Sequence, residues 1–206
     1  MSFGFKTTWL AVRDRPASEV ADALGLAQTE ALPWDEGVQR AYDRGVFVTQ
    51  PVHGWTLAHG RRDLLTLPYG PVDVGFPAWL TALSRQLGEV QLFANERGWS
   101  HHAWTWASQG AIVRAFAISD GALPLFIGAV TPAERELNKG IRTYANDDVR
   151  NWGDAEWDAW HATTPDEFDV LRLAGRWSVD PTRIDGSQTD IAGIFGMPGP
   201  RRSVEA

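Results

Sequence analysis

The sequence contains no cysteine, and this absence excludes disulfide bonds and thiolate metal ligands. A chain without cysteine suits a reducing compartment. No apolar run approaches the roughly 20 residues that a membrane-spanning helix needs, and residues 1–15 lack the apolar block of a signal peptide. We therefore expect a cytoplasmic protein with no membrane segment.

Lysine is almost absent as well, since only Lys6 and Lys139 are present and the other basic residues are arginines. This preference is typical of GC-rich bacterial coding. The net charge of −7 argues against nucleic acid as a partner, because phosphate binding requires a clustered basic face. An acidic surface serves solubility, and it also suits a basic protein partner.

The specific catalytic motifs are missing too. The chain has no Gly-x-Ser-x-Gly elbow, no phosphate-binding Gly-x-x-x-x-Gly-Lys-Ser/Thr loop and no His-Glu-x-x-His helix. His101 and His102 are adjacent, so on a strand they point to opposite faces and cannot hold one metal ion together. We expect neither a metal site nor a cofactor.

The residues that are present predict a folded chain, because 206 residues with 44% hydrophobic content can bury a substantial core. We expect one α+β domain over residues 1–180. Residues 181–206 are polar and rich in glycine and proline, which predicts a loosely docked tail. The mixed, acidic stretch 27–45 predicts a loop with a short helical piece over residues 35–42.

A three-stranded antiparallel meander is expected over residues 89–119. Its strands are residues 89–95, 99–107 and 111–119, which are joined by short links that contain glycine. Thr131 and Thr164 each precede a proline and stand three residues before a glutamate, which predicts two helix N-caps. Together these elements predict an α+β fold with a mainly antiparallel sheet, flanked by helices. A small antiparallel barrel with added helices is the alternative.

Tryptophan is unusually abundant, with 11 residues, and the segment 99–106 contains three of them. On a strand, His102, Trp104 and Trp106 share one face. A three-residue hairpin loop places this face opposite Phe116, Arg114 and Ile112, with Arg114 over an indole ring. A two-residue loop places it opposite Val113, Ala115 and Ala117 instead.

This face supports two interpretations. In the first, Trp104 and Trp106 border a ligand or partner site with His102 and Arg114 at its rim. Glu96 precedes the strand and is a candidate to pair with His102 for acid–base chemistry. In the second, the tryptophans fill an aromatic core, and Arg114 reaches solvent along its stem.

The segment Asp166–Pro181, together with Gly54-Trp55 and the stretch 88–93, resembles segments of uncharacterised bacterial proteins, some of immunity or self-protection type. The resemblance implies an α+β fold with an antiparallel sheet and a role in binding rather than catalysis.

Three functions follow as hypotheses. The first is a cytoplasmic bacterial immunity or self-protection protein that occludes a protein partner, for example a basic toxin, with an acidic, aromatic surface. The second is a small biosynthetic or resistance enzyme that holds a hydrophobic substrate in a tryptophan-lined pocket, with histidine acid–base chemistry. The third is a purely structural subunit.

Overall fold

A computed structural model describes residues 1–61, 64, 75–141, 143–144, 148–188 and 191–199. Within these residues the strands form one nine-stranded sheet in the order β2-β9-β3-β4-β1-β5-β6-β7-β8, and every neighbouring pair is antiparallel. The strands are β1 Thr7–Arg13, β2 Leu26–Leu32, β3 Val46–Val48, β4 Trp55–His59, β5 Glu89–Glu96, β6 His101–Ser108, β7 Ala111–Ser119, β8 Ala122–Ile127 and β9 Gly193–Pro198. The expected α+β class and mainly antiparallel sheet are confirmed.

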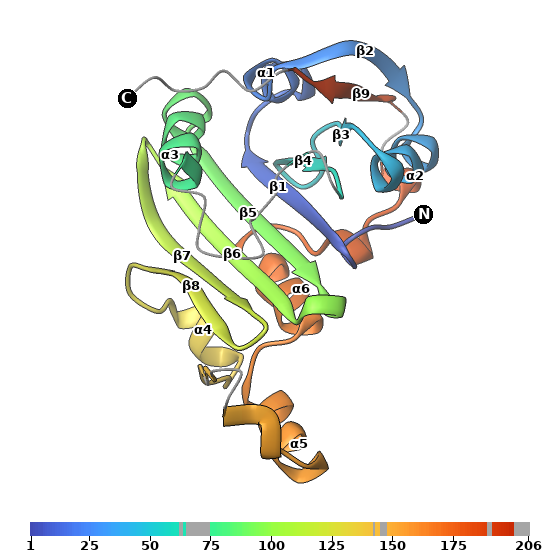
Figure 1. Ribbon diagram of the computed structural model, residues 1–206. Coiled ribbons are helices and arrows are strands. Elements are labelled where there is room, and N and C mark those ends of the chain that lie inside the picture. The colour runs from blue at the N-terminus through green and yellow to red at the C-terminus, as the bar shows by residue number, and fades with distance from the viewer. Residues whose placement is uncertain (62–63, 65–74, 142, 145–147, 189–190, 200–206) are drawn as a thin grey trace.

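Helices cover both faces of this sheet (Figure 1). They are α1 Ala17–Ala23, α2 Trp34–Asp43, α3 Gly75–Leu87, α4 Pro132–Glu136, α5 Asp154–Thr163 and α6 Glu167–Trp177, with 3₁₀ turns at Arg97–Trp99, Asp148–Asn151, Pro181–Arg183 and Gly186–Gln188. None of the helices in the described part of the chain has the length and apolar character needed to cross a bilayer.

Strand alternation divides the interior into two cores. In β1, Leu10 and Val12 face the layer of α1 and α3, while Trp9 and Ala11 face the layer of α2 and α6. The α1/α3 core is aliphatic, and the opposite core holds most of the buried aromatic rings. The tryptophan-bearing face of β6 belongs to this second, aromatic core.

The expected meander is confirmed, and β8 adds a fourth strand to it. The β6–β7 turn has two central residues, Gln109 and Gly110, whose φ angles are 51° and 80°. These positive angles suit the tight turn that matches the twist of a hairpin. A β-bulge at Trp106/Ala107 then shifts the register, so that Trp104 faces Phe116 and Trp106 faces Arg114. Neither register expected from loop length alone is correct for the tryptophan face, because the bulge inserts one residue, Val113, into β7.

Of the two expected N-caps, Thr131 is confirmed. Its hydroxyl accepts from the backbone N–H of Glu134 at 3.2 Å, and the Glu134 carboxylate accepts from the N–H of Thr131 at 2.8 Å. The expectation for Thr164 is wrong, because Thr164 follows the last residue of α5. Asp166 caps α6 instead, since its carboxylate accepts from the N–H of Asp169 at 2.9 Å.

Two strands contradict the sequence expectations. Residues 26–32 form β2, which covers the first part of the expected loop over residues 27–45. Residues 193–198 form β9 between β2 and β3, so this part of the expected tail is an interior strand. Residues 189–190 and 200–206 of that tail lie outside the described residues. β9 contains glycine because neighbours come close: a Cβ at Gly193 would lie 2.5 Å from the Phe47 ring. Close packing requires glycine at such a position, and a glycine-rich segment of sequence is easily taken for a loop.

Candidate functional site

The predicted residues Trp104, Trp106 and Arg114 share the face of the sheet that α4 and α6 cover. Arg114 does not lie over an indole ring, as one register predicted. Its guanidinium carbon lies 4.4 Å from the ring centre of Phe126 and 5.9 Å from that of Phe116. Trp104 stacks on Phe116 with 4.1 Å between ring centres.

Arg114, Glu134 and Trp104 form a closed polar network under α4. The Nε atom of Arg114 donates to both carboxylate oxygens of Glu134, at 2.9 and 3.1 Å, and Trp104 Nε1 donates to the same carboxylate at 2.7 Å. The Nη1 atom of Arg114 donates to the carbonyls of Ala115 and Ile127, both at 2.9 Å. Arg114 Nη2 also lies 2.9 Å from Glu134 Oε1, so each of the three guanidinium nitrogens has an acceptor, which a buried charge requires.

The network fixes the ionisation of Glu134. Burial acts to raise the pKa of this carboxyl, but the hydrogen bonds from Arg114, Thr131 and Trp104 and the charge of Arg114 together lower it below its usual value. Arg114 is only 1% exposed and Trp104 only 3%. The expectation that Arg114 lies at the rim of a cleft is wrong, because its charge is buried against Glu134, which is distant in the sequence.

Trp106 lies nearer the surface than Trp104 and contacts α6. Its ring centre is 5.8 Å from that of Trp177, the last residue of α6, and Trp177 also lies 6.0 Å from Phe93. The carbonyl of Trp177 accepts from the side-chain amide of Gln91 at 3.2 Å. These contacts seat the end of α6 on β5 and β6.

His102 and His101 are both buried at the start of β6, at 6% and 4% exposure. Burial lowers the pKa of each imidazole to about 4, against a weaker opposing effect of Asp166 on His102 and of Glu96 on His101. Both rings are therefore neutral near pH 7.

Glu96 does not pair with His102. The register places Glu96 opposite His101 and Asn95 opposite His102, and adjacent positions point to opposite faces. The Glu96 carboxylate instead accepts from the N–H of Gly98 at 3.3 Å and lies 3.7 Å from Arg61. Glu96 thus stabilises the 3₁₀ turn between β5 and β6.

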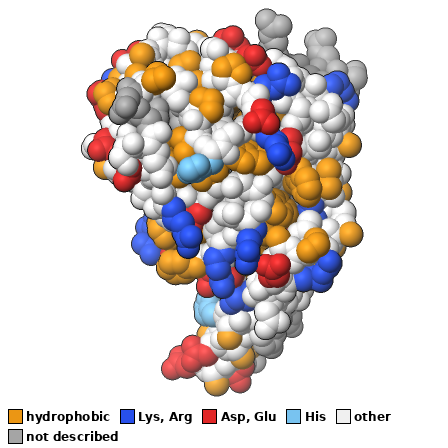
Figure 2. All heavy atoms as spheres, turned by 180° about the vertical axis from the view of Figure 1, so that it is seen from behind, with side chains coloured by type: hydrophobic (Ala, Val, Ile, Leu, Met, Phe, Trp, Pro, Cys, Tyr) orange, Lys and Arg blue, Asp and Glu red, His pale blue; other side chains and the backbone are white. Residues whose placement is uncertain are grey.

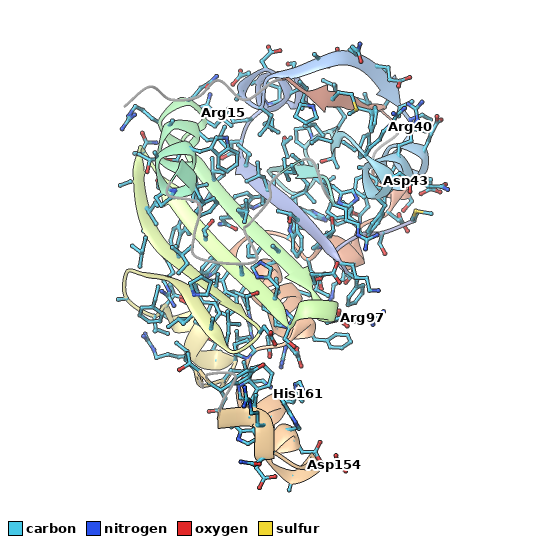
Figure 3. The ribbon with its side chains drawn as sticks, viewed as in Figure 1. Arg15, Arg40, Asp43, Arg97, Asp154 and His161 are labelled. Carbon is cyan, nitrogen blue, oxygen red and sulfur yellow. The ribbon has the colours of Figure 1, made fainter. Side chains whose placement is uncertain are left out.

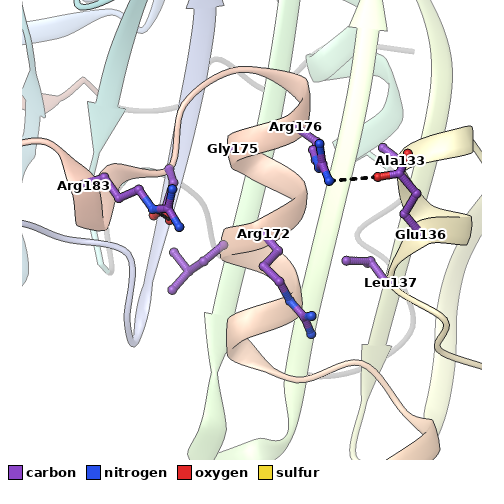
Figure 4. Close-up of a pocket in the computed structure, with 9 residues that line it drawn as sticks. Ala133, Glu136, Leu137, Arg172, Gly175, Arg176 and Arg183 are labelled. Atoms are coloured by element: carbon purple, nitrogen blue, oxygen red, sulfur yellow. Dashed lines mark ion pairs between the residues drawn. The ribbon is translucent and has the colours of Figure 1, made fainter.

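A groove that the sequence did not reveal runs between α4 and α6 and over the outer face of α6 (Figure 4). It has a volume of about 430 Å³. Arg172 and Arg176 extend from α6 toward α4, while Arg183 lies on the other flank of α6. The remaining lining residues are Ala133, Glu136, Leu137, Leu171, Gly175 and Asp180.

Two of the residues predicted from the sequence, Arg114 and Trp106, support the helices α4 and α6 that form the walls of this groove. The Arg114–Glu134 pair anchors α4 to the sheet, and the contact between Trp106 and Trp177 anchors the end of α6. α4 bears Glu136 one turn from its start, and α6 bears Arg172 and Arg176. A binding role for Trp104, Trp106, His102, Arg114 and Glu96 themselves stays a prediction.

The helix α5 projects from the body of the molecule (Figure 1), and Figure 3 shows Asp154 and His161 on this arm. We call the segment 152–163 the α5 arm. It is held by a small aromatic cluster whose rings meet mostly edge to face, formed by Tyr144, Trp152, Trp157, Trp160 and His161. These rings pack directly against one another, because their centres lie 4.9 to 6.2 Å apart, and they do not enclose a space for a ligand.

Tyr144 ties this cluster to the β7–β8 turn. Its hydroxyl donates to Asp120 at 2.9 Å, and its backbone N–H donates to the carbonyl of Gly121 at 3.1 Å. Burial, followed by the hydrogen bond and charge of Asp120, raises the pKa of Tyr144 to about 12. A Cβ at Gly121 would lie 2.4 Å from the Tyr144 ring, so glycine is required for this close approach.

Figure 2 shows the molecule from behind, on the α6 side. Basic side chains gather above the projecting part at the bottom of this view, and acidic side chains lie at the lower end of that projection. Arg97, Arg172, Arg176 and Arg183 have side chains that are 61–85% exposed. The exposed carboxylates of the arm are Asp154, Glu156 and Asp158. Among the described residues, no group of three or more His, Cys, Asp and Glu side chains is arranged to hold a metal ion.

One feature of the sequence, the spacing of two arginines on α6, could have indicated the groove. Arg172 and Arg176 are four residues apart, so they share a helix face, while Leu171 and Ala174 face inward. No comparable signal connects them to Glu136 or Arg183, because those contacts depend on how α4 and the 3₁₀ turn pack. We compared the chain with protein-family models, curated proteins and solved structures, and none of them matches.

Proposed function

We propose that this chain is a cytoplasmic bacterial binding protein of immunity or self-protection type, which occludes a protein partner with the α5 arm. The observation that carries the proposal is the arm itself. α5 has ten residues, of which Trp160 alone is buried, and it projects from the body of the molecule (Figure 1).

An exposed helix is a suitable docking element when it is already rigid, because little conformational entropy is then lost on binding. The aromatic cluster of Tyr144, Trp152, Trp157 and Trp160 supplies this rigidity. Asp154, Glu156 and Asp158 are exposed on the arm, and the chain carries a net charge of −7. These charges favour a basic partner and accelerate its association at low ionic strength.

The enzyme hypothesis has less support from the geometry. It required a tryptophan-lined pocket with an acid–base histidine, yet Trp104 is packed against Phe116 and hydrogen-bonded to Glu134. His102 is buried, and Glu96 is turned toward Arg61. Binding is therefore the function that the described contacts favour.

Site-specific photo-crosslinking tests the proposal. A photoreactive benzoyl-phenylalanine replaces Ala155 or Ala159, both exposed on α5, and Ala27, which is exposed on β2 at the far edge of the sheet, serves as the control position. In the native host we expect one discrete protein adduct from positions 155 and 159 and none from position 27. No adduct from the arm, or the same adducts from all three positions, would contradict the proposal.

Charge reversal tests the basic nature of the partner. Replacing Asp154, Glu156 and Asp158 with lysine should abolish the adduct, whereas the same change at the exposed residues Glu19, Asp35 and Glu36 should leave it intact. For the self-protection role, the crosslinked protein should arrest growth when expressed alone, and coexpression of this chain should restore growth. A partner that is harmless on its own would remove that part of the proposal.

A further inference from the structure

We propose that the groove between α4 and α6 is a binding site for a small organic dianion, with Arg172, Arg176 and Arg183 as the residues that recognise its charged ends. This site is separate from the protein-docking function proposed above, and it belongs to the isolated chain.

The charge of the groove opposes the charge of the whole protein. Three arginines and two carboxylates, Glu136 and Asp180, line it, which leaves an excess of one positive charge. The chain as a whole carries −7. A positively charged concave surface on an acidic protein concentrates anions and disfavours cations.

The arginines retain donors for a ligand. Arg176 Nη2 lies 3.1 Å from Glu136 Oε2, Arg183 Nε lies 3.3 Å from Asp180 Oδ2, and Arg172 Nη2 pairs with Asp169. Each guanidinium has five N–H donors in a planar fork. The contacts described for each one engage a single nitrogen, and the side chains are 61–85% exposed. The acidic partners orient the guanidinium groups while leaving part of each fork accessible to an oxyanion.

The groove is built on rigid supports. Asp169 is fully buried, accepts from the N–H of Asp166 at 3.0 Å and lies 3.6 Å from Lys139, so it is a fixed anchor for Arg172. The α4 wall is fixed by the buried pair of Arg114 and Glu134. Preorganised charged groups lose little freedom when a ligand binds.

The shape of the groove specifies the class of ligand. Its volume of about 430 Å³ falls within the range of small-molecule sites. Arg172 and Arg176 lie on the α4 side of α6 and Arg183 on the other (Figure 4). Leu137 and Leu171 add apolar surface. Two anionic groups joined by a short apolar spacer match this arrangement, because each end meets a guanidinium and the spacer contacts the leucine side chains.

Calorimetric titration of the purified chain tests the inference, with malonate, succinate, glutarate, adipate, inorganic phosphate and the monoanion butyrate as probes at equal ionic strength. We expect saturable binding that is strongest at one dicarboxylate length and at least about tenfold weaker for butyrate. Stronger binding of phosphate than of any dicarboxylate would refute the two-ended mode. No saturable binding by any of the probes would refute the site altogether.

Substitutions locate the site. Arg172→Gln with Arg176→Gln, and separately Arg183→Gln, should each weaken binding of the best dicarboxylate by about tenfold or more. Arg40→Gln is the matched control, since Arg40 is a partly exposed, ion-paired arginine on α2. Circular dichroism verifies the fold of each variant. Affinity that is unchanged in both groove variants, or lowered equally by Arg40→Gln, would overturn the assignment. Because this titration contains no protein partner, its failure leaves the docking proposal untouched.

Discussion

The guanidinium of Arg114 on β7 and the carboxylate of Glu134 on α4 form an ion pair in which neither side chain is more than 4% exposed. Two hydrogen bonds from Nε, at 2.9 and 3.1 Å, join the groups. The pair connects the sheet to the helix that forms one wall of the groove. A change at either residue therefore affects both the stability of the fold and the geometry of the surface.

Glu134→Gln should lower the free energy of unfolding by about 3–5 kcal/mol, because it leaves the buried Arg114 charge without its partner. Urea unfolding at pH 7 measures the loss. Glu136→Gln on the same helix is the control, since Glu136 is 59% exposed and its ion pair is worth about 1 kcal/mol or less. Equal losses in the two variants would contradict the structural role of the buried pair.

The Glu134 pair also predicts a pH dependence. The pKa of Glu134 is lower in the folded state than the usual value of 4.5, so the unfolded chain takes up its proton first as the pH falls. The stabilisation is present above about pH 4.5 and is lost as the pH falls through the folded-state pKa. In Glu134→Gln this component of the acid transition should disappear. An acid transition identical to that of the wild type would refute the assignment.

Three buried histidines predict a second pH effect. Burial lowers the pKa to about 3 for His59 and to about 4 for His101 and His102. The unfolded chain therefore binds protons below about pH 6.5 that the folded chain excludes, and stability falls as the pH drops from 6.5 toward 4. Each histidine contributes a slope of at most about 1.4 kcal/mol per pH unit.

His102→Gln should reduce this slope, as measured by denaturant unfolding at a series of pH values. His53→Gln, at an exposed position, is the matched control substitution. A slope that His102→Gln does not alter would show that His102 titrates equally in both states.

Asp166 and Thr164 differ in their expected contributions to α6. Asp166→Ala should cost about 0.5–2 kcal/mol, because it removes the acceptor for the N–H of Asp169. Thr164→Val should be close to neutral or stabilising, since the buried Thr164 hydroxyl has no hydrogen-bond partner among the described residues. Thermal unfolding of both variants checks the pair. A larger loss for Thr164→Val than for Asp166→Ala would restore Thr164 as the functional cap.

Trp104 and Trp106 should respond differently to truncation. Trp104→Ala should cost about 3–5 kcal/mol, because this ring is buried, stacked on Phe116 and hydrogen-bonded to Glu134. Trp106→Ala should cost less, because Trp106 is partly exposed and contacts Trp177 at the end of α6. Urea titration ranks the two variants, and the reverse order would show that Trp104 is not a core residue.

The sequence by itself determined the elements whose signals are local. The α+β class, the meander over residues 89–119 and the cap at Thr131 depend on side-chain alternation, short links with glycine and a hydrogen bond across three residues. These interactions involve neighbours in the chain, so their pattern is visible in the residue order. The spacing of Arg172 and Arg176 belongs to the same class of local signal.

Tertiary structure alone decided the remaining features, because they depend on residues far apart in the sequence. β9 packs into the sheet because Gly193 leaves room for the Phe47 ring, although the composition of β9 resembles a loop. The bulge at Trp106 set the register opposite Arg114. Arg114 then met Glu134, twenty residues away, and became a buried anchor instead of a surface group. The groove exists because α4 and α6 are each seated on the sheet by such long-range contacts, which no single segment encodes.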